Sequence, residues 1–260
     1  MSDHQQSVLQ QFGPQAGEYL ASAVHARGPD LEHVARLVHE SVPPHALALD
    51  VGCGAGQLSF ALAKHCAGVT ALDPSAEMLA VVAAQASARG LATVQTAQGS
   101  ASALPFRDES FHLAATRYSA HHWTDLAAAL QEMRRVLRPD GLALFIDTLG
   151  DPSALVDTHL QAIELLRDRS HVRNATQSQW RTLLADCGFA VLASQSWPVR
   201  LEFDSWVRRM RTSAARIAAI RALQAEAPAE VRAALAQEDD GSFTIQTGLF
   251  WVRAAARATR

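Results

Sequence analysis

Three glycines stand at alternate positions directly after a short apolar run, in the stretch ALDVGCGAGQ over residues 48–57. Backbone without side chains lets a ligand come close, and the start of a following helix offers free N–H groups. Gly52, Gly54 and Gly56 therefore predict a ligand-binding loop, with a plain strand-to-helix turn as the alternative. Asp50 precedes the loop, and its negative charge favours a cation, such as an ammonium group, over a phosphate.

The spacing of these glycines argues against a dinucleotide. A dinucleotide-binding loop requires the pattern G-x-G-x-x-G, and in this sequence Gln57 occupies the position of the last glycine. Asp73 ends the next apolar run, GVTALD, where a carboxylate accepts hydrogen bonds from both ribose hydroxyls or caps the helix that follows. A ligand with a ribose and an ammonium group but no phosphate fits S-adenosylmethionine. A nicotinamide-dependent dehydrogenase and a non-catalytic binding module are the alternatives.

Two adjacent histidines follow the apolar stretch at 111–118, in the sequence RYSAHHW. A neutral histidine can take a proton near pH 7. We expect His121 to be the catalytic base and His122 to contact the substrate. The alternative is that one histidine caps the next helix and the other is exposed.

The stretch RDRSHVRN over residues 167–174 is rich in arginine. Alternate residues of an extended segment share one face, and arginines that converge on a pocket bind a carboxylate, a phosphate or an enolate. Arg169, His171 and Arg173, which alternate with Arg167, are therefore candidate substrate-binding residues. A solvated loop is the alternative.

Short apolar runs alternate with helical stretches from about Ala46 onward. This alternation predicts a mostly parallel sheet covered on both faces, with ligands outside the carboxyl ends of its strands. The expected strands span residues 46–51, 68–73, 93–98, 111–118 and 141–147, and the expected helices span 57–66, 76–90 and 125–137.

The flanking segments indicate helical additions to this sheet. Upstream, residues 31–40 have apolar residues on one helical face, with Asp30 as the expected N-cap. Downstream, two further strands at 189–195 and 243–252 enclose a long helical stretch at 203–237. We therefore expect one domain over 1–260, with helices at 1–45, a cofactor-binding core at 46–148 and substrate-side helices with the last strands at 149–260.

Composition excludes several classes of protein. Lys64 is the only lysine and no glycine precedes it, so the chain lacks both a nucleotide-binding phosphate loop and a suitable pyridoxal lysine. The net charge of −3 gives no sign of nucleic-acid binding, and no apolar run is long enough to span a bilayer. The three cysteines show no metal or redox spacing, which favours a reducing cytoplasm and no metal site.

Four stretches in order resemble the class I S-adenosylmethionine-dependent methyltransferases, especially the type 11 branch related to ubiquinone and menaquinone biosynthesis enzymes. These stretches are LDVGCGAGQ, ALDPSAEML, GSASALPFRDESFHLAATRYSAHHW and EMRRVLRPDGLALFID, and they cover roughly residues 46–148. The resemblance implies a Rossmann-like, seven-stranded α/β sheet with one antiparallel strand. It also implies an N-terminal helical lid, and the helical stretch at 203–237 is expected to be an insertion before the last strand.

The resemblance also implies roles for particular residues. It places the glycine loop with Asp50 around the methionine part of the cofactor, Asp73 on the ribose, and Ser100 at the adenine edge where the family usually has an acidic residue. The full set of expected cofactor-binding residues is Asp50, Gly52, Gly54, Gly56, Asp73, Pro74, Met78, Ser100, Ala101 and Arg117.

The N-terminal stretch FGPQAGEYLASAVHARG resembles the lid of that family, with Phe12 inside it and Tyr19 and His25 as candidate substrate contacts. Together these features predict an enzyme that transfers a methyl group from S-adenosylmethionine to an oxygen or carbon of a small molecule. The acceptor is expected to be anionic or aromatic, with the oligomeric state left open.

Overall fold

The computed structural model describes residues 3–12 and 29–255, which contain one seven-stranded sheet in the order β3-β2-β1-β4-β5-β7-β6. β7 runs antiparallel to its neighbours β5 and β6, and the other pairs are parallel. The predicted fold class is thereby confirmed. The strands are β1 Leu47–Val51, β2 Gly68–Asp73, β3 Val94–Gln98, β4 Phe111–Arg117, β5 Leu137–Leu149, β6 Phe189–Leu201 and β7 Phe243–Ala254.

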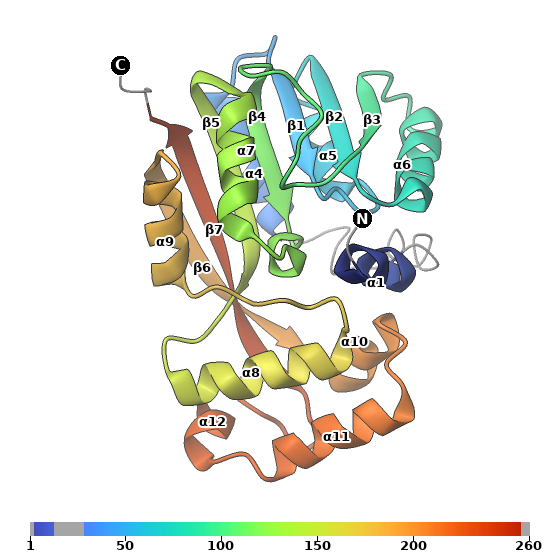
Figure 1. The fold of residues 1–260 in the computed structure, drawn as a ribbon, viewed down its shortest axis with the longest axis vertical. Helices are drawn as coiled ribbons and strands as arrows, with labels where there is room; N and C mark the ends of the chain where they lie inside the picture. The colour runs from blue at the N-terminus through green and yellow to red at the C-terminus, as the bar shows by residue number, and fades with distance from the viewer. Residues whose placement is uncertain (1–2, 13–28, 256–260) are drawn as a thin grey trace.

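Helices cover both faces of this sheet (Figure 1). Apolar residues of α7 and α9, including Leu130 and Trp180, pack in one core, and those of α4 and α5, including Val38 and Leu62, pack in another. The strand order reverses between β1 and β4, so the ligand site is expected outside the carboxyl ends of these two strands. The helices are α4 Pro29–Ser41, α5 Gln57–Leu62, α6 Ala76–Ala88, α7 Leu126–Val136 and α9 Gln177–Asp186.

β6 and β7 continue beyond the carboxyl edge of the sheet into a second, helical body, which we call the cap (Figure 1). The cap has its own apolar core, centred on Trp206, Phe203 and Phe243. Its helices are α8 Ala154–Arg167, α10 Phe203–Arg209, α11 Ala214–Ala225 and α12 Ala229–Ala234. α10, α11 and α12 are the predicted helical insertion. Because the cap lies beyond the carboxyl edge of the sheet, it faces the place where a ligand is expected.

Several boundaries differ from the sequence-based expectation. β6 runs to Leu201 because its far end pairs with β7 and contributes to the cap core. The prediction that Asp30 is the N-cap of α4 is wrong. Asp30 lies in the first turn of α4, where its buried carboxylate accepts a hydrogen bond from Arg117 Nε at 2.5 Å. Across residues 3–12 and 29–255, every helix is too short or too polar to cross a membrane.

Candidate active site

A cavity of about 270 Å³ lies between the carboxyl edge of the sheet and the cap. The glycine loop and Asp73 line one end, and α8 and α10 of the cap line the other. α1 Asp3–Phe12 also borders it, through His4, Val8 and Phe12. The cavity thus connects the glycine loop with the cap at the strand ends.

The glycine loop turns from β1 into α5 with left-handed backbone at Gly52 (φ +70°), Gly54 (+50°) and Gly56 (+85°). Side chains rarely adopt this conformation. At Gly54 no atom lies within 4 Å of the place where a Cβ would stand, and Gly54 lines the cavity. Gly56 differs from the expectation, because a Cβ there would meet Phe60 at 2.9 Å and the residue lies outside the cavity lining.

Asp50 lines the cavity at the end of β1 and is almost fully buried. Its Oδ2 accepts a hydrogen bond from the Ser59 hydroxyl at 2.6 Å. Its Oδ1 is buried and has no hydrogen-bond partner within the part of the chain that the structure describes. Burial raises the pKa of the Asp50 carboxyl to about 7. A cation bound beside this carboxyl would favour its charged form and lower its pKa again.

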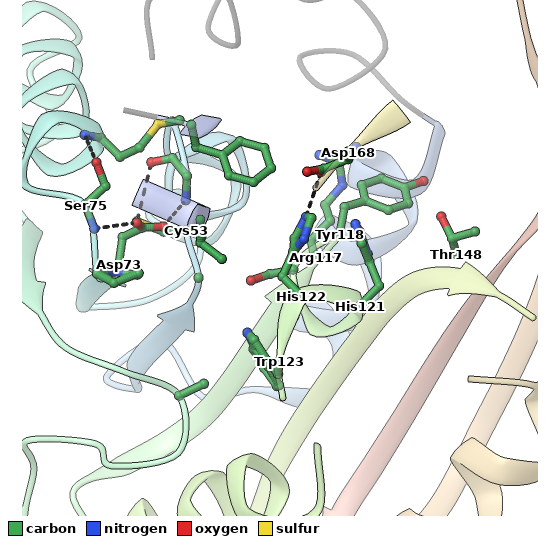
Figure 2. Close-up of a pocket in the computed structure, with 18 of the residues that line it drawn as sticks. Cys53, Asp73, Ser75, Arg117, Tyr118, His121, His122, Trp123, Thr148 and Asp168 are labelled. Atoms are coloured by element: carbon green, nitrogen blue, oxygen red, sulfur yellow. Dashed lines mark hydrogen bonds and ion pairs between the residues drawn. The ribbon is translucent and has the colours of Figure 1, made fainter. Parts of the chain in front are cut away.

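Asp73 shapes the loop as well as lining the cavity. Its carboxylate accepts hydrogen bonds from the backbone N–H groups of Gly54 and Ser75, each at 2.9 Å (Figure 2). Ser75, rather than Asp73, is the N-cap of α6, because its hydroxyl accepts from Met78 N. The other expected cofactor residues that line this end of the cavity are Gly52, Pro74, Met78, Ser100 and Ala101.

The chain bends sharply at the end of β4. Tyr118 has left-handed backbone (φ 53°), which is strained for a residue with a side chain. The bend leads into the short helix η2 Ala120–His122 and carries His121 over the edge of the sheet. His121 and His122 both line the cavity, as expected.

His121, which is partly buried, forms a hydrogen-bonded pair with the buried Asp147. The distance from His121 Nδ1 to Asp147 Oδ1 is 2.5 Å, and the backbone N–H of His121 donates to Asp147 Oδ2 at 3.1 Å. Asp147 lies behind the histidine, outside the cavity lining. Since Nδ1–H donates to the carboxylate, Nε2 is left as the proton-accepting nitrogen.

Neighbouring charges set the basicity of this histidine. Burial alone would lower the pKa of His121, but the charge and hydrogen bond of Asp147, helped by Glu164 and Asp168, outweigh burial and raise it. His122 and His171 pack against His121 with ring centroids 4.1 and 5.9 Å away. Burial and the nearby charge of His121 lower the pKa of both neighbours, that of His171 to about 3. His121 is therefore the most basic of the three histidines.

The predicted alternation of RDRSHVRN on one face is wrong. Asp168 Oδ1 accepts hydrogen bonds from the N–H and the hydroxyl of Ser170 at 2.8 and 2.6 Å, and its carbonyl accepts from His171 N. These bonds fold the segment into a turn. As a result Arg169 is exposed, and it lies outside the cavity lining together with His171 and Arg173.

The structure gives these residues other partners. Arg173 forms an ion pair with Asp157 at 2.6 Å, and His171 Nε2 bonds to Gln161 Oε1 at 2.8 Å. The polar wall of the cap end is instead formed by Glu164, Arg167 and Asp168. The apolar residues that line the same end of the cavity are Val199, Leu201, Trp206, Met210 and Ile245.

The remaining expected residues are placed as follows. Tyr19 and His25 lie outside the described residues. Phe12 lines the cavity and packs edge-on against the His122 ring at 5.0 Å. Arg117 lines the cavity too, but its Nε is bound to Asp30 and its guanidinium lies over the Tyr118 ring at 4.8 Å.

Sequence reasoning missed Asp147, although a signal for it exists. Asp147 ends the predicted strand GLALFID, and β5 lies beside β4, whose end carries the two histidines. Carboxyl ends of adjacent parallel strands meet at one edge of a sheet. An acidic residue at the end of β5 is thus a natural partner for His121.

Comparison with known proteins places these features in a family. Residues 49–145 match the family described as a methyltransferase domain. The chain is 44% identical to the uncharacterized protein YafE of Escherichia coli K12, over 74% of this chain and 93% of YafE. It is 33% identical to the uncharacterized methyltransferase YcgJ of Bacillus subtilis, over 79% of this chain and 80% of YcgJ.

The crystal structure of YcgJ has the same fold, with a TM-score of 0.83, 29% identity, and coverage of 87% of this chain and 98% of that one. A shorter match is the demethylmenaquinone methyltransferase of Chlorobaculum parvum, 35% identical over 39% of this chain and 40% of that enzyme.

Proposed function

The chain belongs to the class I S-adenosylmethionine-dependent methyltransferases of type 11, and from this premise we propose that it methylates a hydroxyl oxygen of a small molecule. The observation that carries the choice of oxygen is the His121–Asp147 pair at the edge of the cavity. A hydroxyl group has a high pKa and benefits from a base in the transition state.

The residues of the glycine-loop end fit S-adenosylmethionine. The buried, unpartnered Oδ1 of Asp50 suits the ammonium group, and the open space beside Gly54 suits the methionine chain. Asp73 would accept from the ribose hydroxyls with its remaining lone pairs, and Pro74 and Met78, which line the cavity, would flank the adenine. Ser100 and Ala101 would meet the adenine edge.

When bound, S-adenosylmethionine supplies a methyl group already activated by its positive sulfur. His121 Nε2 would take the proton of the acceptor hydroxyl as the acceptor oxygen receives the methyl group from the cofactor. The products would be a methyl ether, S-adenosylhomocysteine and a protonated His121. Asp147 fixes the tautomer of His121 and stabilises the positive charge that forms.

The cap end positions the acceptor and excludes water. Trp206 and the apolar ends of β6 and β7 cover one side, and Arg167 is fixed there by donating its Nε–H to the Trp206 carbonyl at 2.9 Å. Water exclusion and alignment are the main contributions a protein makes to an in-line displacement.

Incubation with a panel of hydroxyl compounds and methyl-labelled S-adenosylmethionine tests this proposal. We expect labelled methyl ethers, identified by mass spectrometry, and their loss in His121→Gln. A label found only on carbon, or binding of S-adenosylmethionine with no transfer to any hydroxyl, would contradict it.

We also expect the affinity for S-adenosylmethionine to fall as the pH drops below about 7. Burial gives the Asp50 carboxyl a pKa of about 7, and only its charged form attracts the ammonium group. Below this pKa the affinity should fall by up to about tenfold per pH unit, and above it the affinity should level off. Calorimetric titration between pH 5.5 and 8.5 measures this. Asp50→Asn should bind weakly with little pH dependence, and a flat wild-type profile would refute the role of Asp50.

A further inference from the structure

Asn174, the only asparagine of the chain, lines the cavity and is 1% exposed. Its amide nitrogen Nδ2 is buried and has no hydrogen-bond partner among the residues that the structure describes. A buried N–H group without a partner is unfavourable, and native proteins rarely keep one. A ligand in the cavity can therefore supply the hydrogen-bond acceptor that this amide lacks.

The backbone around Asn174 is held firmly. Its N–H donates to Gln161 Oε1 and its carbonyl accepts from Gln161 Nε2, each at 3.0 Å. Gln161 is itself fixed by a bond from Nε2 to Asp157 Oδ1 at 2.9 Å. Because both backbone polar groups are paired, the side-chain amide is the part of Asn174 that remains for a ligand.

The same segment is tied to the proposed base. The backbone N–H groups of Val172 and Arg173 both donate to the carbonyl of His121, at 2.9 and 3.2 Å. Asn174 follows directly, and both Asn174 and His121 line the cavity. One acceptor in the cavity can therefore meet both residues.

We propose that the Asn174 amide donates a hydrogen bond to a second oxygen of the acceptor, next to the hydroxyl that His121 deprotonates. The acceptor class is then a compound with two neighbouring oxygens, such as an ortho-dihydroxy aromatic ring. This inference rests on the proposed function, because it assumes that the cap end of the cavity holds a hydroxyl acceptor. It makes Asn174 a residue that determines specificity.

The first test compares catechol, hydroquinone and phenol as acceptors. The wild-type chain should prefer catechol in kcat/KM by about 10- to 100-fold over the other two, as expected for one buried hydrogen bond. Asn174→Leu and Asn174→Asp, which remove the donor at similar size, should bring the catechol-to-phenol ratio close to one. Thr116→Val is the matched control: its buried hydroxyl also lacks a partner within the described ranges but lies outside the cavity lining, so the preference should persist.

The second test needs no methyl transfer. In the ligand-free protein, Asn174→Leu should leave the melting temperature unchanged or raise it, as Thr116→Val should, because each removes an unsatisfied buried group. A melting temperature lowered by several degrees would show that the amide already has a partner and would overturn the inference. A catechol preference that survives in both Asn174 variants, or is missing in wild type, would also overturn it. Failure of transfer to every hydroxyl would instead contradict the proposed function, and the melting temperatures would still show whether the Asn174 amide lacks a partner in the ligand-free protein.

Discussion

Replacing His121 by glutamine is expected to lower kcat for methyl transfer by about 10²–10⁴-fold, the usual contribution of a general base. In the proposed mechanism the imidazole Nε2 accepts the proton of the acceptor, and an amide cannot replace it as a base. Turnover should be measured at saturating S-adenosylmethionine, with its affinity determined separately by calorimetry. We expect that affinity to be unchanged, because His121 lies outside the glycine-loop end of the cavity (Figure 2).

The pH dependence of kcat provides the control for this role. The base must be neutral, so kcat should rise with pH through a midpoint above the ordinary histidine pKa, which Asp147 raises. Asp147→Asn should move the midpoint to lower pH, since it removes the charge that raises the pKa, and should lower the plateau because the tautomer is no longer fixed. If His121→Gln raises KM and leaves kcat intact, the histidine positions the acceptor without taking its proton.

The second large effect is expected at the glycine loop, where Gly54→Val should abolish binding of S-adenosylmethionine. A Cβ at Gly54 meets no protein atom within 4 Å and projects into the space assigned to the methionine chain. Calorimetric titration with S-adenosylmethionine and S-adenosylhomocysteine measures the loss.

Gly90→Val separates this steric effect from backbone strain. Gly90 also has left-handed backbone (φ +67°) and no atom within 4 Å of a Cβ, but it lies beyond the end of α6 and outside the cavity lining. Both variants should lose similar stability in thermal unfolding, and only Gly54→Val should lose binding. Binding retained by a folded Gly54→Val protein would show that the loop does not hold the cofactor.

The periodicity of the sequence was sufficient to predict the sheet and its layers. Buried strands such as GVTALD and helices such as 76–90 are local patterns, and their alternation restricts the topology. The positions of Gly52, Gly54 and Asp73 at the cavity were likewise predictable, because these residues lie at or directly after the ends of strands.

The acceptor end was harder to predict because tertiary contacts decide it. The side chain of Asp168 folds RDRSHVRN into a turn, so Arg169 and Arg173 lie outside the cavity lining. Asn174 gives no periodic signal, and its importance depends on a missing hydrogen-bond partner that only three-dimensional contacts reveal.

The most direct test of the account is a crystal structure of the chain with S-adenosylhomocysteine. We predict density for the homocysteine portion against Gly54, with its amino group beside Asp50, its ribose at Asp73 and its sulfur directed toward the side of the cavity that holds His121. Density elsewhere in the molecule would contradict the account. A His121 side chain that points away from the sulfur would contradict its role as the base.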